Sequence, residues 1–226
     1  MSKIRVYLSK IDPHLSQSTY NDLLQIISKE NRERCQRFRR KEDALRTLYG
    51  ELILRHVLTQ HFAFKNDEIE ILKGESGKPY IKGGQVHYNI SHSGDFAVCA
   101  FSEQEVGIDI EQIKEVNLRV AKKYFCRCEC DDLFAQDIGK QAGYFYSLWA
   151  LKESYMKWTG KGMAMPLNSF CFKIIDDNAT VKDINKDITP FFKQLHLEGY
   201  KMAVCSMIED FEVILEEVCV PCIVFG

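Results

Sequence analysis

Two short apolar segments with the same pattern constrain the fold of this chain most. Phe96-Ala97-Val98-Cys99 and Met202-Ala203-Val204-Cys205 are near-copies in separate halves of the chain, and each follows the long helical segments of its own half. A repeated order of helices and then strands predicts an α+β fold built from two similar halves. We expect a pseudo-twofold arrangement, joined near residues 102–105, with an N-terminal half of residues 1–103 and a C-terminal half of residues 104–226.

The segment Gly107-Ile108-Asp109-Ile110-Glu111 follows directly on this junction. Side chains alternate between the two faces of a strand, so Asp109 and Glu111 point to one face and the two isoleucines into a core. Two carboxylates on one face repel each other, and a hard divalent cation with oxygen ligands relieves that repulsion. Glu153, in an expected helix, would supply a third carboxylate. The alternative is two solvated carboxylates on an edge strand.

Positive charge is concentrated in one stretch, because six of the ten residues 32–41 are Lys or Arg. Such a run indicates either a binding site for a compact polyanion, such as a phosphorylated small molecule, or a solvated helix face. The whole chain has a net charge of −2 and a pI of about 6.3, which argues against nucleic acid and anionic membranes as partners.

Apolar spacing predicts helices over residues 16–29, 42–62 and 143–159, and a helical region with an interruption over 116–138. Strands are expected over 4–8, 86–90, 96–101, 106–110, 170–175, 200–207 and 211–215. Residues 91–95 then form the loop of a hairpin, in which His92 either binds a phosphate or caps the turn. Residues 74–80 predict a turn, because their glycines are too close together for a P-loop.

Nine cysteines, an odd number, stand mostly in apolar runs, which predicts reduced thiols rather than a disulfide framework. The spacing of Cys126, Cys128 and Cys130 resembles no common zinc site, and the role of this cluster stays open. The first residues lack the apolar core of a signal peptide, and no apolar run is long enough to span a membrane. We therefore expect a cytoplasmic protein without membrane contact.

Five motifs, in this order, resemble the 4′-phosphopantetheinyl transferases, specifically the monomeric type that activates surfactin synthetase. The motifs are Lys41–Thr47, Gly77–Pro79, Asn89–Ser93, Gly107–Glu111 and Phe145–Lys157, and the resemblance extends over about residues 27–211. It implies a holo-[carrier-protein] synthase, a transferase that moves the phosphopantetheine arm of coenzyme A to a serine of an apo peptidyl or acyl carrier protein and releases 3′,5′-ADP. It also implies the same pseudo-twofold fold and a role in nonribosomal peptide, fatty-acid or polyketide synthesis.

The resemblance also assigns roles by position. Asp109, Glu111 and Glu153 would hold Mg²⁺, with Mn²⁺ as an alternative, and Glu153 would be the base, directly or through a metal-bound water. Lys157 would contact the phosphate at the reacting end, where it and Glu153 are the expected catalytic residues. The residues implied in coenzyme A binding are Arg34, Arg46, Thr47, Lys78, Pro79, Ser91, His92 and Lys157. Of these, Lys78 and Pro79 would contact the adenine. Ser91 and His92 would bind the 3′-phosphate region, helped by Arg34, Arg46 and Thr47. Asn31 stands where close relatives have a lysine facing the 3′-phosphate, so its neighbours would carry that contact.

Met163 and Met165 follow the helix of Glu153 and Lys157, in a glycine-rich segment. Methionines on an exposed segment make an adaptable apolar surface, so we expect both to dock the carrier protein. The alternative places both in the core. Two other functions would use the same residues: a Mg²⁺-dependent pyrophosphohydrolase that consumes coenzyme A without a carrier protein, and a non-catalytic coenzyme A-binding module that tolerates the loss of Glu153.

Overall fold

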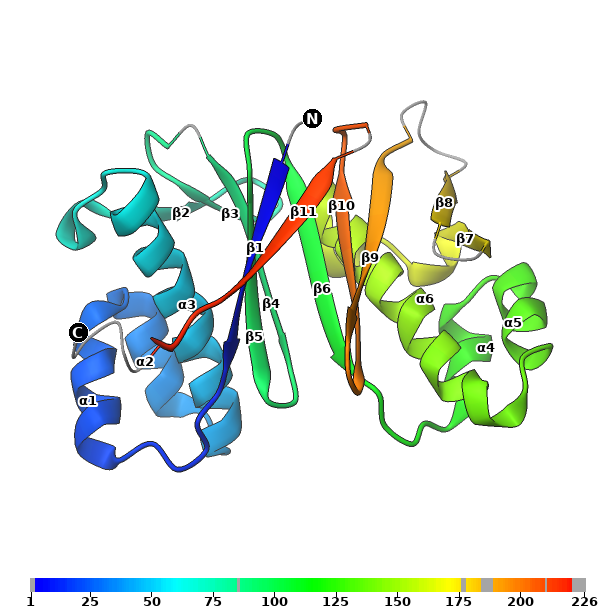
Figure 1. Ribbon diagram of the computed structural model, residues 1–226, viewed down its shortest axis with the longest axis horizontal. Helices are drawn as coiled ribbons and strands as arrows, with labels where there is room; N and C mark the ends of the chain where they lie inside the picture. Colours follow the sequence, from blue (N-terminus) through cyan, green and yellow to red (C-terminus); the bar gives the residue numbers. More distant parts are fainter. Residues whose placement is uncertain (1–2, 85, 176–177, 184–188, 210, 221–226) are drawn as a thin grey trace.

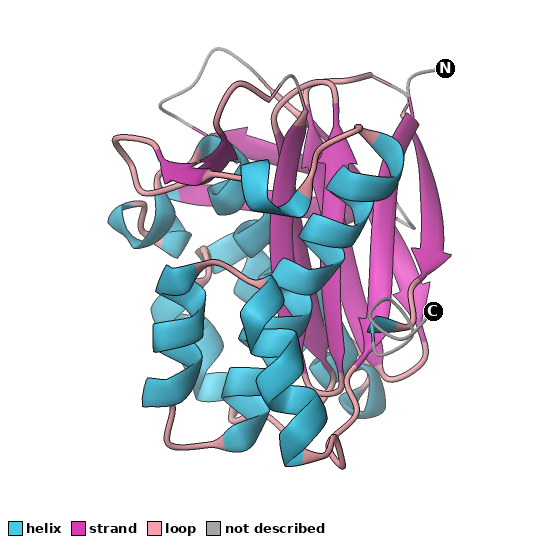
Figure 2. Cartoon of the chain, turned by 90° about the vertical axis from the view of Figure 1, so that its left-hand side faces the viewer, coloured by secondary structure: helices cyan, strands magenta, loops and turns pink. Residues whose placement is uncertain are grey.

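Two β-sheets form the centre of the molecule, and helices cover the outer face of each. The computed structural model describes residues 3–84, 86–175, 178–183, 189–209 and 211–220. Helices α1–α3 lie on one side of the sheets and α4–α6 on the other, as Figure 1 shows. The turned view in Figure 2 shows the strands running nearly parallel to one another behind the helices. The layers are thus helix, sheet, sheet and helix.

Within its described residues, the first half contributes three helices and five strands. In chain order these are β1 (Lys3–Lys10), α1 (Gln17–Ile26), α2 (Lys29–Arg37), α3 (Lys41–His61), β2 (Ile71–Lys73), β3 (Pro79–Ile81), β4 (His87–Ser93) and β5 (Phe96–Ser102), with a 3₁₀ turn at Asn66–Glu68. Ser16 and Ser28 cap α1 and α2, because each serine side chain accepts the backbone N–H three residues later.

The second half repeats a long helix against a sheet. Its elements are β6 (Val106–Gln112), α4 (Ala121–Tyr124), α5 (Arg127–Phe134), α6 (Ile138–Thr159), β7 (Phe170–Ile175), β8 (Asn178–Asp183), β9 (Phe191–Leu197), β10 (Tyr200–Ser206) and β11 (Glu212–Glu217), with 3₁₀ turns at Leu118–Val120, Gly162–Ala164 and Leu167–Ser169. Gly160, in the left-handed conformation at φ +71°, ends α6.

The two sheets have the orders β11-β1-β5-β4 and β6-β10-β9, and the pairs β2-β3 and β7-β8 form separate ribbons. The repeated segments Phe96–Cys99 and Met202–Cys205 lie in β5 and β10, which are both interior strands. Alternate side chains of these strands meet in an apolar layer between the sheets that includes Val98 and Val204. The expected α+β fold of two similar halves is confirmed.

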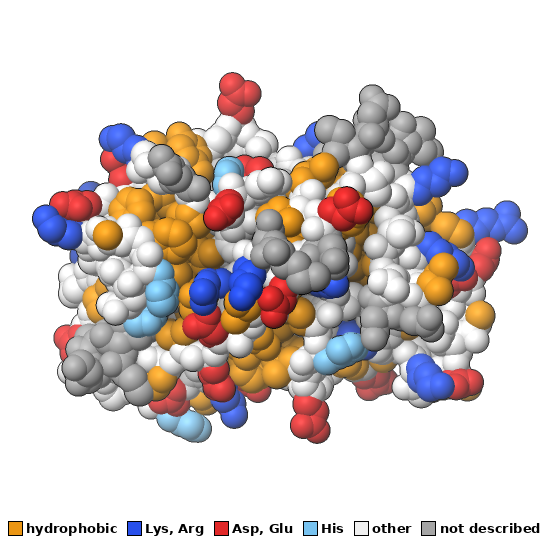
Figure 3. Space-filling model, turned by 45° about the horizontal axis from the view of Figure 1, so that its top comes forward, with side chains coloured by type: hydrophobic (Ala, Val, Ile, Leu, Met, Phe, Trp, Pro, Cys, Tyr) orange, Lys and Arg blue, Asp and Glu red, His pale blue; other side chains and the backbone are white. Residues whose placement is uncertain are grey.

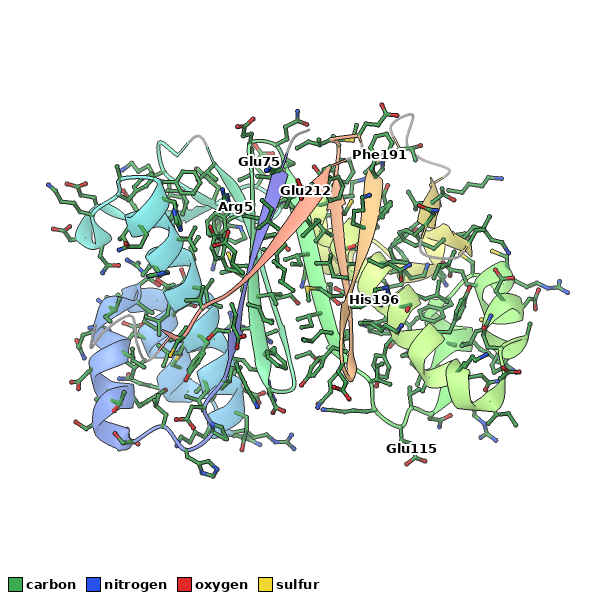
Figure 4. The ribbon with its side chains drawn as sticks, viewed as in Figure 1. Arg5, Glu75, Glu115, Phe191, His196 and Glu212 are labelled. Atoms are coloured by element: carbon green, nitrogen blue, oxygen red, sulfur yellow. A yellow bond between two sulfur atoms is a disulfide. The ribbon has the colours of Figure 1, made fainter. Side chains whose placement is uncertain are left out.

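The C-terminal strand β11 departs from a simple division into halves. It pairs in parallel with β1, at the edge of the first half's sheet. The ion pair Arg5–Glu216 at 2.7 Å supports this pairing, and Figure 4 shows Arg5 and Glu212 on the two neighbouring strands. The boundary expected near residue 103 stays a prediction, to which the structure adds that residues 212–217 cross over to the first sheet.

The predicted helices and strands correspond to observed elements, with two differences. The strands β2, β3, β8 and β9 were not predicted, and β3 begins at Pro79, within the turn predicted over residues 74–80. In addition, β4 runs on to Ser93, so Ser91 and His92 lie in a strand and the loop predicted over residues 91–95 is wrong. The turn itself consists of Gly94, at φ +54°, and Asp95. Among the described residues, no helix combines the length and hydropathy that a membrane span requires.

Candidate active site

Strands β4 and β6 are the facing edges of the two sheets, and side chains rather than a backbone ladder join them. Three alternate residues of β4 each accept a backbone N–H of β6: Asn89 from Ile108 at 2.9 Å, Ser91 from Ile110 at 3.4 Å, and Ser93 from Gln112 at 3.0 Å. We call these three residues the β4 side-chain ladder. It satisfies backbone donors that would otherwise be buried without partners.

The two serines of the ladder also donate hydrogen bonds to the carboxylates of β6. Ser91 Oγ donates to Asp109 Oδ1 at 2.8 Å, and Ser93 Oγ donates to Glu111 Oε2 at 2.8 Å. Both carboxylates thus lie on the same face of β6, as the strand period predicted. Asp109 is buried, whereas Glu111 is partly exposed.

Lys157 reaches this cluster from α6. Its Nζ lies 2.7 Å from Asp109 Oδ1, 2.8 Å from Ser91 Oγ and 3.1 Å from the carbonyl oxygen of Ile108. The helix comes this close because β6 has a glycine at position 107, where a Cβ atom would lie 2.0 Å from the carbonyl oxygen of Ser154. Strands β4 and β6 and helix α6 therefore bring the ammonium of Lys157 and the buried carboxylate of Asp109 together.

The three carboxylates expected to act together all have raised pKa values. Burial is the main cause for Asp109, Glu111 and Glu153, because it disfavours the charged form. The negative charge of Asp109 raises the other two pKa values further, and that of Glu111 reaches about 7. The ammonium of Lys157 opposes the rise in all three. Burial of the three carboxylates, together with repulsion by Asp109 at Glu111 and Glu153, thus outweighs the effect of Lys157 on their pKa values.

The donor chemistry of this cluster fits a hard divalent cation. Asp109 Oδ2 is buried and has no hydrogen-bond partner within the described part of the chain, and the neighbouring donors are carboxylate oxygens. However, no group of three or more His, Cys, Asp and Glu side chains among the described residues is arranged to hold a metal ion. The site of Asp109, Glu111 and Glu153 therefore stays a prediction.

A cavity of about 320 Å³ lies next to the cluster, on the other face of β4. Five residues expected to bind coenzyme A line it together: Arg34 from α2, Arg46 and Thr47 from α3, Pro79 from β3 and His92 from β4. Lys73 of β2 lines it as well. Cationic side chains from three separate elements, α2, α3 and β2, in one cavity are typical of a site for a phosphate group.

His92 is solvent-exposed at this cavity, but the protein around it still disfavours a charged ring. Its pKa is lowered to about 4, mainly by desolvation and further by the positive charges of Lys157, Arg46 and Arg34. Arg46 is held in place by Asp43 at 2.8 Å and by the carbonyl oxygen of Gly94 at 3.0 Å. The ring is therefore neutral at pH 7, and a bound anion would favour its protonation.

Comparisons with known proteins identify the family. The family models "4′-phosphopantetheinyl transferase, N-terminal" and "4′-phosphopantetheinyl transferase superfamily" match residues 12–104 and 105–205. The 4′-phosphopantetheinyl transferase Sfp of Bacillus subtilis (strain 168) is 40% identical over 211 residues, covering 92% of this chain and 94% of that protein. The chain is a 4′-phosphopantetheinyl transferase.

Further relatives agree with this family. The transferase gsp of Aneurinibacillus migulanus is 36% identical over 208 residues, covering 90% of this chain and 86% of that protein. The L-aminoadipate-semialdehyde dehydrogenase-phosphopantetheinyl transferase of Mus musculus is 29% identical, over 71% of this chain and 57% of that protein. Among solved structures, the holo-[acyl-carrier-protein] synthase of Thermotoga maritima matches with a TM-score of 0.39 and 18% identity, over 45% of this chain and 61% of that chain.

In this transferase, the side chains of Ser91 and His92 do not face the same place, although the sequence analysis grouped them. They are neighbours in a strand, so their side chains point to opposite faces. Ser91 contacts Asp109 and Lys157, whereas His92 lines the cavity of about 320 Å³ that Arg34 also lines, called the cavity of Arg34 below. The expected role of Ser91 at the 3′-phosphate is therefore corrected: Ser91 belongs to the carboxylate cluster.

Lys78 and Pro79 lie where the cavity of Arg34 meets a second cavity of about 500 Å³, and Pro79 lines both. The ammonium of Lys78 binds Glu105 and donates to the carbonyl oxygens of Val106 and Trp158 at 3.2 and 3.3 Å. It therefore links β3 to the junction between the halves. Contact of Lys78 and Pro79 with adenine stays a prediction.

The side chain of Asn31 takes part in a hydrogen-bond network around the buried carboxylate of Glu51. Its Nδ2 donates to Glu51 Oε2 at 2.6 Å, and Glu51 also pairs with Arg55 at 2.7 Å and accepts from Ser28. That neighbours of Asn31 carry the 3′-phosphate contact stays a prediction. Basic and acidic side chains are interspersed on the face that Figure 3 shows, so charges of both signs share that face.

The expected docking surface of two methionines is wrong for Met165. A 3₁₀ turn folds the segment back, the Met165 N–H donates to Gly162, and the side chain is buried in the core of the second half. The side chain of Met163 lies outside the described residues. An apolar side chain next to a core gains more from burial than from exposure.

The prediction of reduced thiols rather than disulfides is wrong for three of the described cysteines. A disulfide joins Cys126, before α5, to Cys171 in β7, and Cys219 is disulfide-bonded as well. Cys35, Cys99, Cys128, Cys130 and Cys205 are free thiols. Sequence spacing missed the pair because the two residues are 45 positions apart and meet only through packing.

Three further residues at or beside the site were missed by the sequence analysis. Asn89 and Ser93 stand at alternate positions with Ser91, so the strand period alone could have placed them on the carboxylate side. No sequence pattern pointed to Lys73, because the short strand β2 reaches the cavity only through the tertiary fold.

Proposed function

We propose that this transferase moves the 4′-phosphopantetheine group of coenzyme A to a serine hydroxyl of an apo peptidyl or acyl carrier protein, with release of 3′,5′-ADP. The observation that carries the proposal is the contact of Lys157, Ser91 and Asp109 next to a cavity lined by Arg34, Arg46 and His92. The two sites fit the two charged groups of one ligand, a pyrophosphate and a 3′-phosphate. The match to the family over nearly the whole chain supports the same reaction.

The cluster at β4 and β6 would bind the pyrophosphate. Asp109, Glu111 and Glu153 would hold Mg²⁺, or Mn²⁺ in its place, which when bound supplies positive charge to the pyrophosphate oxygens. Lys157 adds a second positive charge and is held by Asp109 and Ser91 so that its ammonium needs little reorganisation. Arg34, Arg46, Thr47 and His92 would bind the 3′-phosphate.

Glu153 is the proposed base. Its raised pKa makes it a better proton acceptor than an ordinary carboxylate, and it lies one helical turn from Lys157. It would take the proton of the carrier serine as the serine oxygen bonds to the phosphorus that bears the pantetheine arm. The bond from this phosphorus to the 3′,5′-ADP oxygen breaks, and 3′,5′-ADP leaves. The proposal includes a monomeric, cytoplasmic enzyme, which gel filtration and cell fractionation test.

The deciding experiment incubates the protein with coenzyme A and Mg²⁺, with and without an apo carrier domain, and weighs the products by mass spectrometry. Transfer requires the carrier to gain the phosphopantetheine mass while 3′,5′-ADP appears. Coenzyme A consumed without a carrier would instead indicate a pyrophosphohydrolase, and binding without any product a non-catalytic module. Asp109→Ala and Glu153→Ala should each abolish transfer, and activity within tenfold of wild type in both would contradict the assignment.

A further inference from the structure

The β4 side-chain ladder does more than join the two sheets. We propose that Ser93 is a positioning residue for the transfer reaction: it holds the Glu111 carboxylate on the face of β6 that Asp109 shares. The inference rests on the proposed function, because it assigns Glu111 to the cation site of that reaction. Ser93 itself would touch neither the substrate nor the reacting atoms.

The hydrogen bonds of Ser93 fix the direction of its hydroxyl proton. The oxygen accepts the backbone N–H of Gln112 at 3.0 Å and donates to Glu111 Oε2 at 2.8 Å. A serine hydroxyl has a single proton. Since the Gln112 N–H occupies one side of the oxygen, the proton points to the carboxylate, and the backbone of β6 orients the group that holds Glu111.

Glu111 needs such a restraint. It is partly exposed at the open end of the cluster, beside the negative charges of Asp109 and Glu153. A free glutamate side chain in this place would rotate toward solvent, because that separates it from two like charges. One hydrogen bond to the charged oxygen opposes the rotation. Groups that orient a cation's ligands in this way typically change cation affinity or activity by about 10- to 100-fold when removed.

Asn89 provides a matched control within the same ladder. Its side chain accepts the Ile108 N–H at 2.9 Å, so it joins β4 to β6 as Ser93 does. Among the described residues, however, it has no hydrogen bond to a carboxylate. Loss of Asn89 should therefore weaken the junction between the sheets and leave the position of Glu111 unchanged. The two residues separate a structural role from a positioning role.

The test compares wild type with Ser93→Ala, Ser93→Thr and Asn89→Ala. Mn²⁺ affinity is measured by electron paramagnetic resonance in the presence of coenzyme A, together with the melting temperature, kcat and KM for coenzyme A. We expect Ser93→Ala to weaken Mn²⁺ binding and lower kcat by about tenfold each. Ser93→Thr keeps the hydroxyl and should recover both to within about threefold. Asn89→Ala should lower the melting temperature while Mn²⁺ affinity stays within about twofold of wild type.

Two results would overturn the inference. Mn²⁺ affinity equal to that of wild type in Ser93→Ala would mean that Glu111 does not depend on Ser93, and equal losses in Ser93→Ala and Asn89→Ala would mean a structural role alone. Wild type that transfers phosphopantetheine without binding Mn²⁺ would also overturn it and leave the proposed function standing. Wild type that binds Mn²⁺ but transfers nothing would refute the proposed function, while the affinities still decide the role of Ser93.

Discussion

Gly107 sets the distance between β6 and α6, and its replacement by alanine should damage both stability and catalysis. The added Cβ would lie 2.0 Å from the carbonyl oxygen of Ser154 and 2.6 Å from the backbone nitrogen of Trp158. Both atoms belong to the helix backbone, so no side chain can rotate away. The helix must move by roughly 1 Å before the contact even approaches what real structures tolerate.

The magnitudes follow from that displacement. Overpacking of this kind costs about 1–3 kcal/mol, which for a chain of this size lowers the melting temperature by roughly 2–12 °C. The same movement carries Lys157 away from Asp109, now 2.7 Å distant, to beyond hydrogen-bond range. A misplacement of about 1 Å in a catalytic group lowers the rate by roughly 100-fold.

The assay is thermal unfolding together with the transfer rate to an apo carrier domain. Gly139→Ala is the matched control, because a Cβ there meets no atom within 4 Å, and it should leave both quantities unchanged or raise stability by up to about 1 kcal/mol. If Gly107→Ala melts within about 1 °C of wild type and transfers within about twofold of the wild-type rate, the close approach does not hold the site together.

Three other outcomes are expected. Met165→Ser should lower stability by about 2–5 kcal/mol without changing the KM for the carrier, since the side chain is in the core; a raised KM with an unchanged melting temperature would restore the docking role. Dephospho-coenzyme A should bind more weakly than coenzyme A, as measured by calorimetry, because it lacks the 3′-phosphate. Both His92→Ala and Lys73→Ala should reduce this difference in affinity. Equal affinities of wild type for the two ligands would refute the phosphate site. In metal-free protein, the free energy of unfolding should fall as pH rises from 4.5 to about 7, because folded Glu111 keeps its proton over that range. Glu111→Gln should flatten this pH dependence. The same pH profile in the variant as in wild type would contradict the raised pKa of Glu111.

The sequence by itself determined the local geometry of the site. The strand period placed Asp109 and Glu111 on one face of β6, and the helix period placed Glu153 and Lys157 one turn apart on α6. It also predicted the two-half fold, because the repeated segments of β5 and β10 carry the same apolar alternation. These features depend on residues close together in the chain, for which backbone periodicity is sufficient.

The tertiary structure decided which of these local faces meet. It showed that the side chains of Ser91 and His92 face different places, since a strand that extends to Ser93 turns them to opposite sides. It placed Lys73 in the cavity of Arg34, buried Met165, and joined Cys126 to Cys171. Each of these depends on how closely separate elements pack. That distance is set by contacts such as the one Gly107 permits between β6 and α6, and no periodicity along the chain records it.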